Sequence, residues 1–208
     1  MQNRTPLHVA LLATVVVVMA WSGWKPYDRL TWWLEISPGL AALIVLAATY
    51  RRFRFTTLVY ILIALHISVL CVGGHYTYAR VPLFEWLKPH FGWHRNHYDR
   101  LGHFMQGFVP AMISREILLR LAVLNRRRWL PFIVVSICLA ISAFYELIEW
   151  WTALFSGSAA NDFLGSQGDF WDTQADMCLA LIGAIVALVF LSKLHDRALE
   201  NSRQNVAT

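Results

Sequence analysis

Charged residues are scarce in this chain of 208 residues. Only 15% of them are Asp, Glu, Lys or Arg, and 57% are hydrophobic, whereas soluble domains carry about 25% charged residues. A soluble protein so poor in charge would expose large apolar patches and would aggregate. The shortage of charge therefore argues against a cytosolic enzyme, a disordered chain and a secreted disulfide scaffold. It indicates a polytopic membrane protein.

Cysteine pairs and short catalytic motifs are also missing. The three cysteines, Cys71, Cys138 and Cys178, lie inside apolar runs and form no CxxC pair. We therefore expect neither a disulfide nor a thiolate metal site. The sequence contains no HExxH or GxSxG motif, so no short motif defines a reaction class.

Long apolar runs, by contrast, are abundant. A membrane-spanning helix needs about 20 mostly apolar residues, and its backbone polar groups must be hydrogen bonded within the segment. Six stretches predict an all-α transmembrane bundle that forms a single domain over residues 1–208. The first stretch, which follows Arg4 and contains Val-Met-Ala, also has the pattern of a cleavable signal peptide. The predicted spans are about 7–24, 32–50, 56–74, 99–119, 130–155 and 172–194, with an outer loop at 75–98.

Basic residues predict how these spans are oriented, because Lys and Arg favour the cytoplasmic side. With six spans, both ends of the chain and the loops at 50–55 and 120–129 lie on one side, which holds twelve Lys and Arg against six on the other. Both termini are therefore predicted to be cytoplasmic. The basic runs 51–54 and 126–128 flank spans, so we expect them to bind membrane lipids rather than nucleic acid.

Ionisable residues gather at the predicted outer ends of the last three spans. Each of these spans carries two of them at a spacing of three or four residues, which places the pair on one face of a helix. With a rise of 1.5 Å per residue the depths of the three pairs overlap, so a shared pocket is predicted. The pairs are Asp99 with His103, Glu146 with Glu149, and Asp172 with Asp176.

This predicted pocket holds more acids than cations. A charge costs about 2.5–3.5 kcal/mol at the centre of a span and less near its ends, so five ionised carboxylates need compensation. A divalent metal ion would supply it. Carboxylates with imidazole suit Zn, Mn or Fe, and carboxylates alone suit Mg or Ca. The predicted metal ligands are His103, Glu146, Glu149, Asp172 and Asp176.

Three functions are compatible with such a pocket. The first is a metal-dependent enzyme that acts on a lipid headgroup or a lipid-linked envelope precursor, since the pocket opens at headgroup depth. The second is a protein that binds an envelope ligand and uses its acids only to hold helices together. The third is an ion or solute transporter, which needs a polar path across both halves, whereas the inner half looks poor in ionisable residues and His195 looks interfacial.

The enzyme hypothesis assigns roles to six residues near the outer face. An arginine can hold an anionic phosphate ester. Asp99 is the predicted base, because a metal-bound water needs a proton acceptor. The predicted catalytic residues are Asp99, Glu146 and Glu149, and the predicted substrate-binding residues are Arg95, Arg100 and His75.

Four strings carry a family resemblance. They are GGHYTYA, NHYDRLGHF, ELIEWW and GDFWDTQADM, in this order along nearly the whole chain, and together they resemble the YjdF family of bacterial inner-membrane proteins. The resemblance implies a location in the cytoplasmic membrane and implies no activity. The Asp-x-x-x-His-Phe, Glu and Asp-x-x-x-Asp layout is also similar to part of the VanZ-like membrane proteins, whose last motif often ends in Asn where this chain has Asp176.

Overall fold

The computed structural model describes residues 5–156 and 166–207, and these residues form helices with no strand among them. The predicted all-α class is confirmed. The elements are α1 (Thr5–Gly23), α2 (Arg29–Thr49), α3 (Thr57–Tyr76), α4 (Pro82–Phe91), α5 (Tyr98–Arg120), the 3-10 turn η1 (Arg127–Trp129), α6 (Leu130–Ser156) and α8 (Asp172–Ala207).

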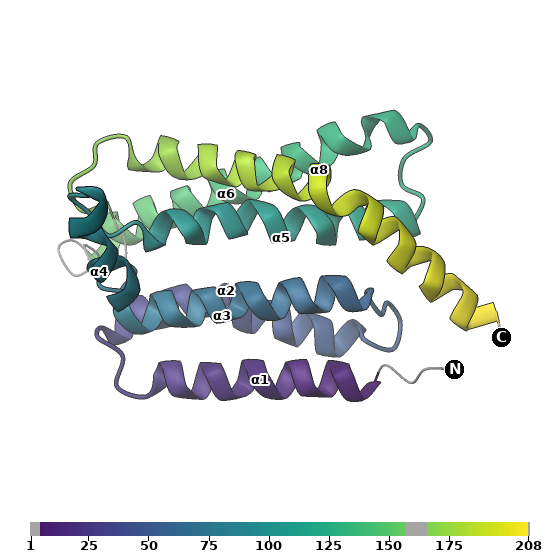
Figure 1. The fold of residues 1–208 in the computed structure, drawn as a ribbon, viewed down its shortest axis with the longest axis horizontal. Coiled ribbons are helices and arrows are strands. Elements are labelled where there is room, and N and C mark those ends of the chain that lie inside the picture. Colours follow the sequence, from purple (N-terminus) through teal and green to yellow (C-terminus); the bar gives the residue numbers. More distant parts are fainter. Residues whose placement is uncertain (1–4, 157–165, 208) are drawn as a thin grey trace.

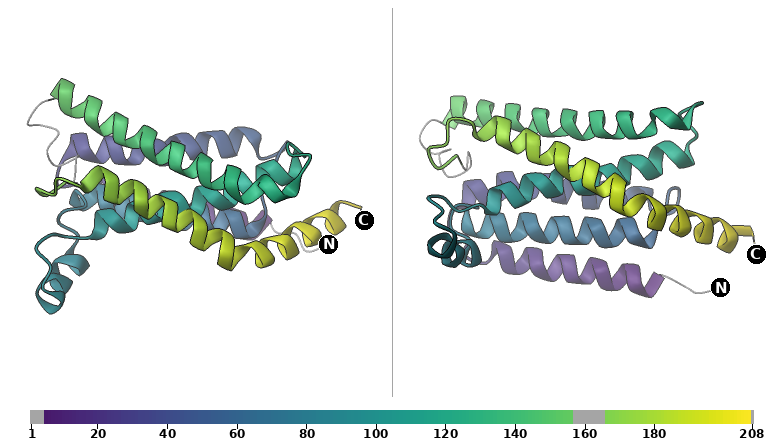
Figure 2. Two further views of the ribbon diagram at one scale, coloured as in Figure 1. Left: turned by 90° about the horizontal axis from the view of Figure 1, so that it is seen from above. Right: turned by 45° about the horizontal axis from the view of Figure 1, so that its top comes forward.

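The long helices lie lengthwise beside one another in two groups (Figure 1). Helices α1, α2 and α3 form one group, α5, α6 and α8 form the other, and α3 packs on α5 to join them. Helix α4 lies across one end of the bundle, and both ends of the chain lie at the opposite end. The two further views in Figure 2 show the same arrangement. We name these the α4 end and the terminal end, which correspond to the predicted outer and inner faces.

Five helical segments of the described chain are long and apolar enough to cross a membrane: Thr5–Gly23, Arg29–Thr49, Thr57–Tyr76, Arg127–Phe155 and Asp172–Ser202. Helix α5 does not qualify, because ionisable residues occupy both of its ends. It nevertheless contacts α3, α6 and α8 in the bundle, and its polar residues are largely buried against them. The sixth span and the orientation of the termini stay predictions.

Glycines allow α5 and α8 to pack closely. A Cβ atom on Gly107 would overlap the backbone carbonyl of Ala180, and one on Gly183 would overlap the carbonyl of Phe104. Small residues at such positions let two helix backbones approach in a membrane. Buried apolar residues, Val109 among them, continue the contact toward the terminal end. The middle of this helix pair is therefore apolar and closely packed, and it separates the polar residues at the two ends.

The predicted outer loop contains a helix of its own. Helix α4 begins with Pro82, a residue that suits the first helical turn. It is terminated by the following residue, Gly92, whose φ of 64° a glycine adopts without strain. None of its residues is buried, and Trp86 and Phe91 are among its exposed aromatic side chains. Exposed aromatic residues at the end of a bundle are typical of the membrane interface.

Candidate functional site

Side chains predicted to share an outer pocket come together around one histidine. His103 Nε2 lies 3.5 Å from Asp99 Oδ1 and 3.8 Å from Asp176 Oδ2, and its Nδ1 lies 3.7 Å from Glu146 Oε1. These side chains come from α5, α6 and α8, so the tertiary packing brings together pairs that are far apart in the sequence. We call Asp99, His103, Glu146, Glu149 and Asp176 the His103 cluster.

The His103 cluster contains two sets of side chains with spacing near that of metal ligands. In each set the candidate ligand atoms lie within 4.8 Å of one another, and all are buried. Two ligands on opposite sides of a zinc ion at 2.0–2.2 Å are at most about 4.4 Å apart, so small side-chain movements would bring them into reach. The sets are Asp99, His103 and Asp176, and His103, Glu146 and Glu149.

Arg95 organises the acids on the side of the cluster nearer to α4. Its guanidinium bonds to Asp99 at 3.4 Å, to Asp169 at 3.3 Å and to Asp172 through a short contact. Burial alone would lower the pKa of Arg95, but the hydrogen bond and the charge of Asp172 outweigh this and raise it. Asp172 therefore pairs with an arginine and contacts the His103 cluster through Arg95, whereas it was predicted as a direct metal ligand.

Arg100, the other predicted substrate-binding arginine, is more accessible. Its side chain is 34% exposed and bonds to Asp169 at 3.0 Å. The backbone amide of Trp171, together with Arg95 and Arg100, holds the pKa of Asp169 below its usual value. An exposed arginine held by a partly exposed carboxylate can exchange that partner for an incoming anion. Arg100 thus keeps the geometry of a candidate anion-binding residue.

His75, the third predicted substrate-binding residue, lies in a different environment. Its Nδ1 is 2.9 Å from the carbonyl oxygen of Ser22, and its ring stacks on Trp21 with 4.7 Å between centroids. These contacts join α3 to α1 and do not involve the His103 cluster. They describe a histidine that fastens two helices at the α4 end.

One acid at this end was missed by the sequence reasoning. Glu35 on α2 is only 5% exposed, and its Oε2 accepts a hydrogen bond of 3.2 Å from the Tyr145 hydroxyl. The Tyr145 ring centroid is 6.4 Å from that of His103, so Glu35 extends the polar region into the other helix group. A carboxylate inside the apolar span predicted at 32–50 was the signal, and no role was assigned to it.

The acids at the α4 end outnumber the cations. Two oxygens, Glu146 Oε1 and Asp176 Oδ1, are buried without a hydrogen-bond partner among the described residues, which is costly for a carboxylate. The buried cationic or titratable basic groups beside these acids are Arg95 and His103. The six buried carboxyl groups are those of Glu35, Asp99, Glu146, Glu149, Asp172 and Asp176.

A second buried polar cluster lies at the terminal end and corrects two predictions. His195, predicted to be interfacial, is completely buried, and so is Glu116; the inner half is therefore not poor in ionisable residues. His195 Nε2 lies 2.9 Å from Glu116 Oε2, although 79 residues separate them in sequence. The prediction failed because α8 continues past residue 194 and packs on α5 there.

Hydrogen bonds indicate which ring nitrogen of His195 donates in this second cluster. Arg115 Nη1 lies 2.8 Å from His195 Nδ1, and since an arginine can only donate, Nδ1 must accept and the proton lies on Nε2. Arg115 also bonds to Asp196 at 2.7 Å, and Arg120 bonds to Glu116 at 3.0 Å. We call Thr56, Arg115, Glu116, Arg120, His195 and Asp196 the Glu116–His195 network.

The fold and these buried clusters define an α-helical integral membrane protein. The family model described as "Predicted membrane protein (DUF2238)" matches residues 7–197. The chain is 48% identical over 186 residues to the "Inner membrane protein YjdF" of Escherichia coli (strain K12), which covers 89% of each chain. This chain belongs to the DUF2238 family, and the predicted YjdF resemblance is confirmed. No solved structure matches it.

Proposed function

We propose that the His103 cluster binds a divalent metal ion and forms the active site of a membrane enzyme. The enzyme lies in the bacterial inner membrane, and its α4 end faces the periplasm. Its substrate is an anionic lipid headgroup or a lipid-linked envelope precursor. One observation carries the proposal: six buried carboxyl groups surround one arginine and one histidine, and two of their oxygens have no hydrogen-bond partner among the described residues.

The charges favour a bound cation over a purely structural cluster. If all six carboxyl groups are ionised and His103 is protonated, the six negative charges and two positive charges sum to −4. Protonating several carboxyl groups would reduce this charge, but it would leave their oxygens without partners. A divalent ion reduces the net negative charge and uses those oxygens as ligands.

His103 has the geometry of a supported metal ligand. Its Nδ1 faces Glu146 and Gln106, whereas its Nε2 faces Asp99 and Asp176. One ring nitrogen can bind the metal while the other donates its proton to a carboxylate or an amide oxygen. This arrangement fixes the tautomer and the ring orientation of metal-binding histidines.

The remaining residues have separate roles in the proposed reaction. The metal, when bound, would make a water molecule acidic enough to attack the phosphorus of a phosphate ester, which breaks the P–O bond to the leaving alcohol. That alcohol would take up the proton that Asp99 accepts from the water. Asp99 on α5 would accept the proton of that water, and Arg95 holds Asp99 in place. Arg100, partly exposed beside Asp169, would bind the anionic group of the substrate. Aromatic residues of α4 would keep the site at headgroup depth.

Metal content and activity test this proposal together. Protein purified without chelators should contain about one divalent ion per chain by elemental analysis, and Glu149→Gln should weaken metal binding. Loss of a ligand or its support typically costs 10–100-fold in affinity or activity. Glu85→Gln is the matched control, because Glu85 is an exposed acid of α4 that pairs with Lys88. Metal-free protein, combined with release of lipid phosphate that Glu149→Gln leaves unchanged, would refute the proposal.

The structure also offers support for the second hypothesis, in which the protein binds an envelope ligand and the acids serve stability. Arg95 joins α5 to the start of α8 through Asp99 and Asp172. Under this alternative, Asp172→Asn and Asp176→Asn would lower stability and leave ligand binding intact. Transport is less well supported, since the close apolar contact between α5 and α8 at Gly107 and Ala180 separates the two polar clusters.

A further inference from the structure

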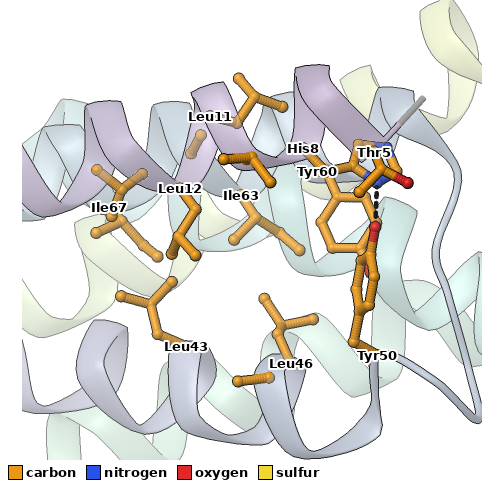
Figure 3. Close-up of a pocket in the computed structure, with 14 residues that line it drawn as sticks. Thr5, His8, Leu11, Leu12, Leu43, Leu46, Tyr50, Tyr60, Ile63 and Ile67 are labelled. Carbon is orange, nitrogen blue, oxygen red and sulfur yellow. Dashed lines mark hydrogen bonds between the residues drawn. The ribbon is translucent and has the colours of Figure 1, made fainter. Parts of the chain in front are cut away.

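A cavity outside the His103 cluster lies between α1, α2 and α3 near the terminal end (Figure 3). Its volume is about 300 Å³, which is at the lower end of the range for ligand pockets. Aliphatic side chains from all three helices line most of it. They include Leu11 and Leu12 of α1, Leu43 and Leu46 of α2, and Ile63 and Ile67 of α3.

One end of this cavity is polar. His8 is buried there, with Nδ1 2.9 Å from the Tyr50 hydroxyl and Nε2 3.2 Å from Thr57 Oγ1. Figure 3 shows His8, Tyr50 and Tyr60 gathered at this end of the aliphatic lining. The cavity is thus amphipathic, with a long apolar part and a short polar part.

Basic residues follow directly after the polar end. Arg51 and Arg52 are exposed, and no ion pair engages them within the residues that the structure describes. The Arg54 guanidinium lies 4.6 Å from the centroid of the Tyr50 ring, so it is held at the same end. Three arginines without a neighbouring acid in residues 50–55 make this rim strongly positive.

We propose that the cavity binds one acyl chain of an anionic phospholipid from the leaflet at the terminal end. The acyl chain lies along the aliphatic lining, the ester region reaches His8 and Tyr50, and the phosphate pairs with Arg51, Arg52 and Arg54. Basic pockets between transmembrane helices bind anionic headgroups in this way. This site is at the opposite end of the bundle from the His103 cluster and does not depend on the proposed function.

Two adjacent alanines provide a matched test of the apolar part. Ala47 and Ala48 are both exposed on α2, but only Ala47 lines the cavity. In nanodiscs of phosphatidylethanolamine with phosphatidylglycerol, native mass spectrometry should show wild-type protein retaining phosphatidylglycerol. Ala47→Phe should lower this retention by roughly tenfold or more, because the ring fills space in the cavity and reduces the apolar area that an acyl chain can bury there. Ala48→Phe should leave the retention unchanged. Equal retention by the two variants would overturn the proposal.

The arginines are tested separately, so that the result does not depend on one substitution. Arg51→Gln with Arg52→Gln should remove the preference for phosphatidylglycerol over phosphatidylethanolamine. Arg126→Gln with Arg128→Gln, in the other basic loop, should leave it intact. Unfolding midpoints within the wild-type range show that the variants fold. An equal loss of preference in both double variants would indicate diffuse surface charge and overturn the site, as would a cavity occupied by a second copy of the chain in cross-linking experiments.

Discussion

The two buried polar clusters lie at opposite ends of the same helices, α5 and α8, and contain similar side chains. In the Glu116–His195 network, Glu116 accepts hydrogen bonds of 2.7–3.0 Å from Thr56, His195 and Arg120. In the His103 cluster, the contacts between His103 and its carboxylates are 3.5–3.8 Å long. The distances at Glu116 are those of hydrogen bonds, whereas the distances at His103 are longer, so we call the His103 cluster loose.

The two clusters also differ in how well their charges are balanced. The carboxylates of Glu116 and Asp196 balance the guanidinium groups of Arg115 and Arg120, and His195 is neutral by its hydrogen bonds. At the α4 end, carboxylates exceed cations. A satisfied, neutral network holds helices together, whereas a loose cluster with excess charge of one sign is arranged for a ligand. We therefore propose a structural role for the Glu116–His195 network and a ligand-binding role for the His103 cluster.

The largest expected effect is at the Glu116–His195 network. Glu116→Ala leaves Arg120, His195 and the Thr56 amide without their shared acceptor. Leaving a buried donor unsatisfied costs about 1–3 kcal/mol, and two buried donors, the Thr56 amide and His195 Nε2, lose their acceptor. We therefore expect the free energy of unfolding in mixed micelles to fall by about 2–6 kcal/mol. Glu200→Ala, at an exposed acid on α8, serves as control. A Glu116→Ala protein as stable as the control would contradict the structural role.

The second effect is stabilisation by metal at the other cluster. A ligand that binds only the folded state adds about 2.7 kcal/mol when its free concentration is a hundred times its Kd. Adding Zn²⁺ or Mn²⁺ to chelator-treated protein should therefore raise the unfolding midpoint of the wild type. Glu149→Gln should abolish the rise, whereas the Glu116→Ala protein, if it folds, should keep it. The same rise in wild type and Glu149→Gln would place the bound metal elsewhere.

A third substitution, Asp176→Asn in the His103 cluster, should increase stability, in contrast to Glu116→Ala at the terminal end. Asp176→Asn removes one of several neighbouring like charges and one unpartnered oxygen, so in excess chelator we expect it to stabilise the protein by about 1 kcal/mol. Thermal unfolding monitored by tryptophan fluorescence would measure the change. Destabilisation by Asp176→Asn without metal would show that this carboxylate serves stability, and would remove the contrast between the clusters.

The smallest effect is a pH dependence at the rim of the His103 cluster. The Trp171 amide, Arg95 and Arg100 lower the pKa of Asp169 in the folded state. The contribution of ionised Asp169 to the free energy of unfolding is therefore present above the unfolded-state pKa of about 3.9. It is lost as the pH falls below that value. The stability difference between wild type and Asp169→Asn should be small near neutral pH and should shrink in acid. A difference that is constant with pH would contradict the ion pairs.

Much of the site could be predicted because helical spacing is a local property. Asp99 and His103 share a face of α5 at any tertiary arrangement, and the apolar spans around them marked their charges as unusual. The pairing of Asp172 with Arg95 could not be predicted, since the arginine lies before α5 and the acid opens α8. Glu35 was missed for the same reason, because its Tyr145 partner is 110 residues away.

Apolar composition and helical periodicity were enough to establish an all-helical membrane protein with acidic residues gathered at one end of its helices. Both follow from short stretches of chain and from the cost of polar groups in lipid. The tertiary structure alone decided which polar residues are satisfied. It packs α5 against α8 through Gly107 and Gly183. This contact separates the fully hydrogen-bonded Glu116–His195 network from the His103 cluster, whose contacts are longer. Hydrogen-bond partners from distant helices cannot be read from local spacing, and they distinguish the two clusters.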